Sequence, residues 1–444
     1  TDSDDNIVGL NVCSLWAYTS NHGWSCVTPY EEYRPVLGYY DEGSAETADW
    51  EIKFLTEHGV DFQAFCWYAN QTNAPMKTTG LSAQLDDAYM HSKYGDKVKF
   101  CLLWEAANAS KPVNSAAFRN YYVPYWIENY FTDPRYMTIN NKLVFSIFCA
   151  DQLINAFGAG LKDEFDYMRE EVKKLGFDGA IFLSCGGPTE AVRDCGFDGV
   201  YAYNWGTQGF DPDYTKAQIT SQREKKLVHV VPTVSTGFNR IGWGSPRTPQ
   251  MTCEDMGECL RWFKEDVLPT SEGEDWKKKL VMFSTWNEYG EGTYICPSNL
   301  HGFGYLDEMR KAFTNESASH TDIRPDEHQL DRLGYLYPKG RSLIRCEQYL
   351  EKCKPTEHVD DIPTDAAYWQ PENGLVIQNR DGKLCGTTDK FDPQILHTGL
   401  SIDANEVKGV HIRLKANSGG GANTCVYFIT DTDSAWSESK GVHV

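Results

Sequence analysis

Short apolar runs recur along the first part of the chain, and longer stretches of mixed polar and apolar residues separate them. Short runs of this kind are typical of strands that are buried on both faces of a parallel sheet. Eight of them are present, at residues 7–15, 62–67, 98–103, 143–148, 180–184, 200–203, 227–231 and 280–285. We therefore predict eight parallel strands.

Helices are predicted in the intervals between these runs. The clearest lie at residues 45–57, 117–130, 162–175, 253–267 and 306–313. Where a helix leads into the next run, the connection carries a glycine at Gly59, Gly176 or Gly196. Glycine adopts the left-handed conformation that ends many helices. The repeated order of helix, glycine and apolar run indicates loops that feed parallel strands.

Eight strands that alternate with helices are the content of an α/β protein with a closed (β/α)8 TIM-type barrel. A doubly wound open sheet has the same alternation, but no glycine-rich phosphate loop follows the first run. We expect the barrel to occupy residues 1–350. Its active site would then lie where the strands end, on the C-terminal side.

The last part of the chain has a different pattern. Residues 351–365 are predicted to form a linker, and β-like runs at 374–378, 410–414 and 425–429 follow it. We expect a smaller all-β, sandwich-like domain at residues 366–444, which could bind carbohydrate. This segment is shorter than the roughly 100 residues of a typical sandwich, so we expect the natural chain to continue.

The net charge, the lengths of the apolar runs and the first residues of the chain limit the binding partners and the location that we expect. The net charge of −21 disfavours binding to nucleic acid or to an anionic membrane, because both require a basic surface. No apolar run approaches the roughly 20 residues of a membrane span. The chain begins with the polar segment Thr1-Asp2-Ser3 and has no initiator methionine, so we expect a processed, exported protein.

Cysteine and histidine positions do not indicate a metal. Several of the 14 cysteines, such as Cys66 and Cys101, lie inside apolar runs and are typical of buried free thiols. No Cys/His spacing resembles a zinc motif. His301 and His320 are expected to be loop or packing residues. We therefore expect neither a metal nor an organic cofactor.

The candidate chemistry lies directly after the eighth run. The segment Trp286-Asn287-Glu288-Tyr289-Gly290-Glu291-Gly292-Thr293 carries two carboxylates three residues apart. Side chains alternate along a strand, so the chain must leave the strand before Glu291 if both acids are to face one side. Two neighbouring carboxyl groups are the usual machinery of glycosidic bond cleavage. Glu288 and Glu291 are therefore the candidate catalytic residues.

Aromatic and polar residues follow most of the other runs, as expected for a sugar-binding cleft, although any single one could serve packing alone. Aromatics form 13% of the chain. The candidate substrate-binding residues are Tyr40, Trp67, Tyr68, Trp104, Glu105, Asn108, Tyr203, Trp205, Arg240, Trp286, Asn287 and Tyr289.

Four segments resemble the WbsX-like branch of the glycoside hydrolase family 99 relatives. They are Leu37-Gly38-Tyr39-Tyr40-Asp41, His58-Gly59-Val60-Asp61, Asp133-Pro134-Arg135-Tyr136 and Trp286–Thr293, and the resemblance spans roughly residues 6–315. Hydrolases of this family cleave α-mannosidic linkages and carry a bulkier residue at the position of Gly290.

The resemblance implies a retaining mechanism with roles for both acids. Glu288 would be the base that takes the proton of the sugar 2-hydroxyl, and Glu291 would be the acid/base. A 1,2-anhydro sugar would form and water would then open it. The implied substrates are α-linked, manno-configured glycans, including rhamnosides. Two alternatives stay open: a glycosyltransferase-like enzyme of polysaccharide assembly and a non-catalytic glycan-binding barrel.

Overall fold

The computed structural model describes residues 4–17, 24–70, 78–107, 110–333, 365–388 and 393–397, with 425–427, 429 and 441–443. The chain divides into two compact units, residues 1–343 with 419–444 and residues 344–418. Each unit is described by itself. The predicted linker at 351–365 lies almost wholly outside the described residues, and the predicted domain limits stay predictions.

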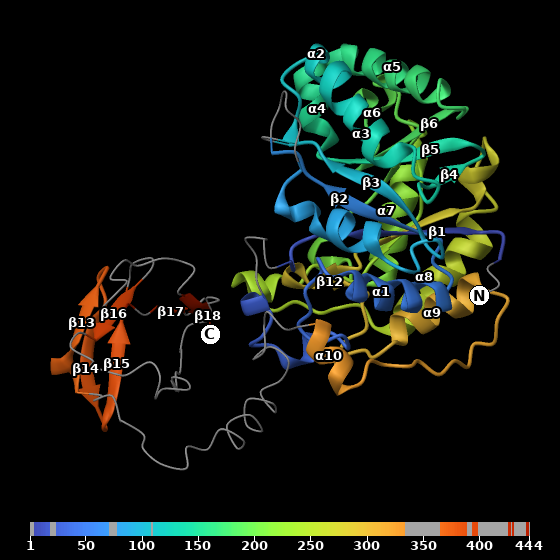
Figure 1. Cartoon of the computed structure of the whole chain (residues 1–444). Coiled ribbons are helices and arrows are strands. Elements are labelled where there is room, and N and C mark those ends of the chain that lie inside the picture. Colours follow the sequence, from blue (N-terminus) through green and yellow to red (C-terminus); the bar gives the residue numbers. More distant parts are fainter. Residues whose placement is uncertain are drawn as a thin grey trace. The chain divides into compact units, whose positions relative to one another are not determined.

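A ten-stranded sheet forms the centre of the first unit (Figure 1). Neighbouring strands are parallel in the order β8-β7-β6-β5-β3-β2-β1-β10-β9, and β4 pairs antiparallel with β5. The strands are β1 (Ile7–Val12), β2 (Phe62–Trp67), β3 (Lys99–Glu105), β4 (Thr138–Ile139), β5 (Lys142–Phe148), β6 (Gly179–Cys185), β7 (Gly199–Tyr201), β8 (His229–Val230), β9 (Thr233–Ser235) and β10 (Leu280–Ser284). All eight predicted strands are present.

The two edges of this sheet meet in one interrupted strand. β8 pairs with β7, β9 pairs with β10, and only Val231 and Pro232 separate β8 from β9. The Val231 N–H donates to Val200 O at 2.8 Å, and Pro232 O accepts from the Met282 N–H at 3.0 Å. The sheet therefore curls closed as a TIM-like barrel. The seventh strand runs past its predicted end at residue 231, because Pro232 removes one donor without ending the strand.

Helices surround the sheet (Figure 1). The longer ones are α1 (Ala45–Glu57), α4 (Ala150–Phe157), α5 (Leu161–Lys173), α7 (Pro212–Glu224), α8 (Cys253–Trp262) and α9 (Gly304–Phe313). Three connecting glycines have positive φ, with Gly59 at 80°, Gly176 at 96° and Gly196 at 83°. The predicted left-handed glycines are thus confirmed.

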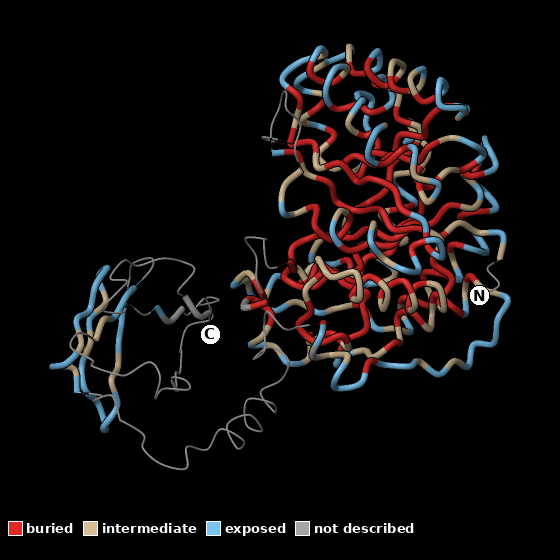
Figure 2. The backbone as a smooth tube through the Cα atoms, in the orientation of Figure 1, coloured by how far each residue is buried: buried red, intermediate tan, exposed pale blue. Residues whose placement is uncertain are grey.

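The barrel wall is buried along most of its length (Figure 2). Side chains alternate between its two faces. Trp67 and Trp104 are register neighbours on β2 and β3, and both pack on Trp126 of α3 (Val123–Trp126), at ring distances of 5.5 and 5.0 Å. The indoles at these two strand ends therefore face the outer helices, and the residues next to them face the barrel interior.

Small antiparallel sheets follow the barrel in the chain. In the second unit, β13 (Trp369–Glu372) pairs with β16 (Gln394–His397), and β14 (Val376–Arg380) pairs with β15 (Lys383–Thr387). Cys425–Tyr427 pairs with Gly441–His443. The predicted run at 410–414 lies outside the described residues. None of the described helices is long and apolar enough to cross a membrane.

Candidate active site

The two candidate acids lie on a short hairpin directly after β10. Strand β11 (Asn287–Glu288) pairs antiparallel with β12 (Thr293–Tyr294), and the 3-10 turn Tyr289–Glu291 joins them. The chain thus leaves the extended conformation between Glu288 and Glu291. This turn allows two acids three residues apart to face the same region.

Two glycines of the hairpin meet close neighbours. Gly292 has φ of +63°, in the left-handed region that favours glycine. A Cβ atom at Gly290 would lie 2.4 Å from the indole of Trp243, so the backbone at this position is in contact with that ring. Gly242 packs against Gly290 in the same way, with 3.1 Å between its Cβ position and Gly290 Cα.

Glu288 is the more deeply buried of the two acids, with 5% of its surface exposed. Burial raises the pKa of Glu288 to about 7, and the charge of Glu291 adds to the rise. Hydrogen bonds from Cys13 and Tyr203 act in the opposite direction. The Tyr203 hydroxyl donates to Glu288 Oε2 at 3.3 Å. Glu288 is therefore suited to exchange a proton near neutral pH.

Glu291 is partly exposed and lies near a cation. Burial raises the pKa of Glu291, while the charge of Arg240 lowers it. Arg240 is exposed, with its guanidinium 5.6 Å from the ring of Phe238. Glu288 and Glu291 influence each other's ionisation, so their titration belongs to the pair and not to either residue alone.

Tyr68 and Glu105 face the same region from β2 and β3. Each follows one of the outward-facing indoles by one residue, so each points to the barrel interior. Burial raises the pKa of Tyr68, and the charges of Glu288 and Glu105 raise it further. The pKa of Glu105 is itself raised by burial. Tyr68, Glu105 and Tyr203 are thus the predicted residues that the structure brings toward Glu288.

A buried chain of hydrogen bonds fixes the base of the hairpin. Asn287 accepts from the Cys13 N–H at 2.8 Å and donates to Gln84 Oε1 at 3.0 Å. Gln84 donates in turn to Glu51 Oε2 at 3.0 Å. Glu51 also accepts from the indole N–H of Trp286 at 2.7 Å. Asn287 and Trp286 therefore anchor the start of the hairpin through buried hydrogen bonds, and their side chains do not face an open site.

Three residues around the hairpin were not predicted from the sequence, namely Cys13, Gln84 and Glu51. One signal for Glu51 was available, because it lies on the face of α1 that also buries Ala48, Ile52 and Leu55. An acid on the apolar face of a helix is unusual. Its burial raises the pKa of Glu51 to about 7. For Cys13 and Gln84 no pattern in the sequence pointed to the site.

Tyr40 and Tyr289 belong to an aromatic cluster beneath the acids. Their hydroxyls lie 3.1 Å apart and both side chains are buried. Trp16 stacks on Trp24 at 4.5 Å, and both rings contact Tyr289 at 5.2 Å. The expectation that Tyr40 and Tyr289 contact substrate is replaced by a packing role.

Four further expectations need correction or fall outside the structure. Trp67 and Trp104 are fully buried against the helices, because their side chains point to the outer face of the barrel wall. Trp205 is buried too, and its indole donates to Thr233 O at 3.0 Å. None of these three indoles is available as a sugar platform in this arrangement. Asn108 lies outside the described residues.

Comparison with known proteins gives one family match. Residues 30–241 match the family described as "Glycosyltransferase WbsX". This range includes Tyr68, Tyr203 and Arg240 and ends before Glu288. No curated protein matches the chain.

Solved structures with similar architecture include a glycoside hydrolase-like protein, which is 15% identical with a TM-score of 0.51 and covers 71% of this chain and 96% of its own. A GH99 endo-alpha-mannosidase from Bacteroides thetaiotaomicron, in complex with BIS-TRIS-propane, is 17% identical with a TM-score of 0.47. That match covers 70% of this chain and 98% of the mannosidase. The match to the hydrolase-like protein agrees with the TIM-like fold described above.

Proposed function

We propose that the chain is a retaining glycoside hydrolase of α-linked, manno-configured glycans, and the match of residues 30–241 to the WbsX family supports this proposal. The observation that carries the proposal is the acid pair at the end of β10, in which buried Glu288 has a pKa of about 7 that the charge of Glu291 helps to raise. A pair of electrostatically coupled acids with raised pKa values is typical of catalysis, because burying them costs stability.

The proposed reaction has two steps. Glu288 takes the proton of the sugar 2-hydroxyl, and the resulting oxygen attacks the anomeric carbon while Glu291 protonates the departing glycosidic oxygen. The products are a 1,2-anhydro sugar and the leaving-group alcohol. Water then attacks the anomeric carbon, giving its proton to Glu291 and breaking the bond from that carbon to the 2-oxygen, and the 2-oxygen recovers its proton from Glu288. In a manno-configured α-glycoside the axial 2-hydroxyl lies opposite the axial leaving group, so its oxygen can attack from behind.

The first step requires that the pair hold one proton. Repulsion between the two carboxylates favours this state, because the second ionisation is resisted by the charge left by the first. The Tyr203 hydroxyl and the Cys13 thiol stabilise negative charge on Glu288. Arg240 favours negative charge on Glu291. The surrounding residues therefore support one acid and one base near neutral pH.

The assignment of roles within the pair has two versions. The resemblance to family 99 makes Glu288 the base and Glu291 the acid. Deeper burial of Glu288 favours the reverse, because it keeps the single proton on Glu288 in the free protein. A substrate with a strongly acidic leaving group distinguishes them, because departure of that group needs no protonation. The variant of the true acid then keeps most of its activity on this substrate, and the variant of the true base loses it.

The name of the matched family supports a second candidate, glycosyl transfer. The same acid pair would activate an acceptor hydroxyl in place of water. Incubation with a sugar nucleotide and a glycan acceptor separates the two functions, because a transferase consumes the nucleotide donor and a hydrolase does not.

The proposal is tested by incubating the purified chain with α-mannans and α-rhamnans and measuring newly formed reducing ends. The matched control is Glu265→Gln, which alters an exposed glutamate of the helical segment Phe263–Val267. We expect release of sugar by the wild type and by this control, and none by Glu288→Gln. Equal release by Glu288→Gln and wild type would refute the proposal.

A further inference from the structure

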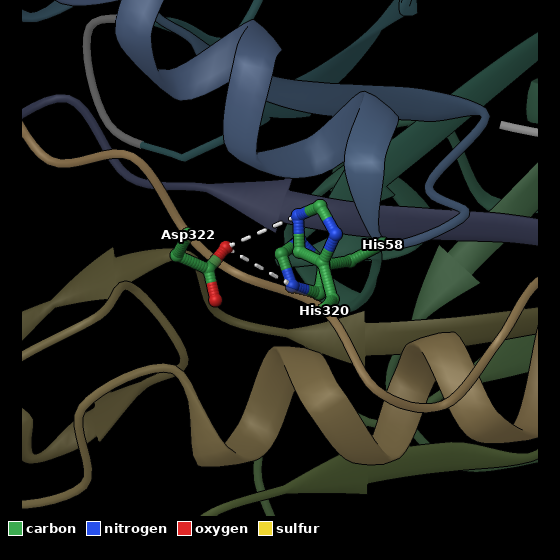
Figure 3. Close-up of side chains that lie close together, drawn as sticks. All are labelled: His58, His320 and Asp322. Atoms are coloured by element: carbon green, nitrogen blue, oxygen red, sulfur yellow. Dashed lines mark ion pairs between the residues drawn. The ribbon is translucent and has the colours of Figure 1, made fainter.

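Figure 3 shows a second cluster of ionisable side chains. It contains His58, which follows the last residue of α1, together with His320 and Asp322 from the extended segment after α9. His58 precedes β2, whereas Glu288 follows β10, and these parallel strands both pair with β1. The two clusters therefore belong to opposite ends of the barrel. We propose that His58, His320 and Asp322 form a binding site for a structural zinc ion.

The spacing of the three side chains fits a small ion. Asp322 Oδ1 lies 3.5 Å from His58 Nε2 and 3.6 Å from His320 Nε2, and the ligand atoms all lie within 4.8 Å of one another. Ligands bound tetrahedrally to zinc at 2.0–2.1 Å are separated by about 3.3 Å. Small side-chain adjustments would bring all three atoms to these distances.

His58 is held in the orientation that a metal ligand needs. Its Nδ1 lies 2.6 Å from the backbone oxygen of Phe54, so Nδ1 carries the proton and Nε2 presents a lone pair. The ring is fully buried, and Nε2 has no hydrogen-bond partner among the described residues. Asp322 Oδ1 likewise has no hydrogen-bond partner there. Two buried polar atoms without hydrogen bonds that point toward each other indicate a missing partner between them.

A second carboxylate, outside this group of three, lies next to His58. Asp307 Oδ1, from the first turn of α9, lies 3.8 Å from His58 Nε2. Two imidazoles and two carboxylates suit zinc, which prefers nitrogen ligands and tetrahedral geometry, better than calcium or magnesium, which prefer oxygen ligands only. A shift of the Asp307 side chain toward the other three residues would complete a set of four protein ligands, and the ion would then be structural, with no position left for a substrate.

The proposed ion would fasten three parts of the barrel together. His58 belongs to the connection from α1 to β2, Asp307 to α9, and His320 and Asp322 to the segment that follows α9. This segment is also held by Arg310, whose Nε donates to Ser317 O at 2.8 Å. These parts are far apart in the chain, so no short Cys/His spacing in the sequence marks the site. This is why the sequence predicted no metal.

The ordinary alternative is a network of ion pairs without metal. His320 Nε2 also lies 3.2 Å from Glu57 Oε2, and Glu57 pairs with Lys53 at 2.6 Å. In that arrangement His320 would be a partner of Glu57 and would have no role as a ligand. The two arrangements make different predictions for metal binding.

The test measures zinc binding to the chelator-treated full chain by calorimetry, and binding of cobalt(II) by visible absorption. The variants are His320→Gln and Asp322→Asn, chosen because both residues are partly exposed and their replacement leaves the core intact. The control is His91→Gln, which changes an exposed histidine of the segment Tyr89–His91. Circular dichroism verifies the fold of each variant.

We expect one zinc ion per chain in the wild type and in His91→Gln, with the visible bands of tetrahedral cobalt. Zinc affinity should fall at least about tenfold in His320→Gln and in Asp322→Asn. Zinc should raise the melting temperature of the wild type and of His91→Gln, and much less that of the two ligand variants. Wild-type protein without a tetrahedral cobalt spectrum would overturn the proposal. Equal zinc affinity in all four proteins would overturn it too, because the ion would then bind elsewhere. Neither outcome bears on the acid pair.

Discussion

The indole of Trp243 occupies the space that a side chain at position 290 would need. A Cβ atom built on Gly290 lies 2.4 Å from two carbon atoms of the Trp243 ring and 2.7 Å from its nitrogen. Gly290 lies between Glu288 and Glu291, so this contact is part of the turn that presents both acids. The ring belongs to the connection between β9 and α8, so the contact joins this connection to the turn.

Replacement of Gly290 by alanine is therefore expected to disturb the turn. The added methyl group must displace the ring of Trp243, which we expect to lower the free energy of unfolding by about 1–3 kcal/mol, as overpacking typically does, and to reduce turnover. Gly160→Ala is the matched control, because nothing lies within 4 Å of that Cβ position. Urea unfolding and glycan hydrolysis measure the two effects.

A double-mutant cycle with Trp243→Ala tests the cause. Removal of the ring opens the space, so adding Gly290→Ala to Trp243→Ala should destabilise less than adding it to the wild type. Strictly additive losses of stability would show that the contact between ring and glycine is not the reason.

The pH dependence of hydrolysis should reflect the coupled acids. The active form holds one proton on the pair, so activity falls at high pH when that proton is lost. Because the pKa of Glu288 is about 7, we expect the alkaline limb of kcat/KM near pH 7. Activity should also fall in acid, where the second carboxylate becomes protonated. A profile that stays flat from pH 5 to pH 9 would contradict this account.

The Glu291→Gln variant tests the coupling directly. Because the charge of Glu291 raises the pKa of Glu288, removal of that charge should lower it. Glu51 and Glu288 both have a pKa of about 7 in the wild type. Infrared titration of the carboxylates should show one of these two groups titrating at lower pH in the variant. An unchanged titration would mean that the two acids are not electrostatically coupled.

Tyr203→Phe should raise the pKa of Glu288, whereas Glu291→Gln should lower it. The Tyr203 hydroxyl donates to Glu288 and stabilises its charged form, so its loss should raise the pKa of Glu288 and move the alkaline limb upward. We expect roughly a two- to tenfold lower kcat/KM at neutral pH, consistent with loss of one hydrogen bond. Tyr121→Phe, at an exposed tyrosine, should leave the profile unchanged. An identical profile for Tyr203→Phe and wild type would remove this hydrogen bond from the mechanism.

Stability should depend on pH through buried Glu51. The folded chain raises the pKa of Glu51 from its ordinary value of 4.5 to about 7. Between these two pH values Glu51 keeps its proton in the folded chain and loses it in the unfolded chain. The contribution of Glu51 to the free energy of unfolding is therefore fully present below pH 4.5 and is lost as the pH rises through 7. The loss is at most about 3 kcal/mol. Glu51→Gln should weaken the decline in unfolding free energy between pH 5 and pH 8, whereas an unaltered decline would contradict the assignment.

Much of the fold could be predicted from the sequence, because buried parallel strands and left-handed glycines leave local signals. Gly59, Gly176 and Gly196 each marked a strand that the structure confirms. The closure of the barrel was harder to predict from the sequence. It passes through Val231 and Pro232, where a proline interrupts a strand that continues to Ser235.

The site was only partly predictable, because a strand end does not reveal which of two neighbouring residues faces inward. Trp67 and Trp104 looked like sugar platforms, yet Tyr68 and Glu105, one residue further, face the acids. The buried support from Glu51 and Gln84 depends on contacts between distant segments. Such contacts become visible only after the chain has folded.

Both acids are expected to be essential for turnover and dispensable for folding. Glu288→Gln and Glu291→Gln should each reduce kcat on the order of 10²–10⁴-fold, as loss of an acid or base does, while glycan binding in a calorimeter persists. The Glu265→Gln control should keep full activity. Loss of glycan binding and turnover together would point to a structural role for the acid concerned.

The central claim is that this acid pair cleaves an α-linked, manno-configured glycan with retention. Its most direct test is a proton NMR time course that identifies the first anomer released from an α-mannan or α-rhamnan oligosaccharide, with Glu288→Gln as the inactive reference. The account predicts that the α-anomer appears first and that the β-anomer forms later by mutarotation. Appearance of the β-anomer first, or equal release by Glu288→Gln, would contradict it.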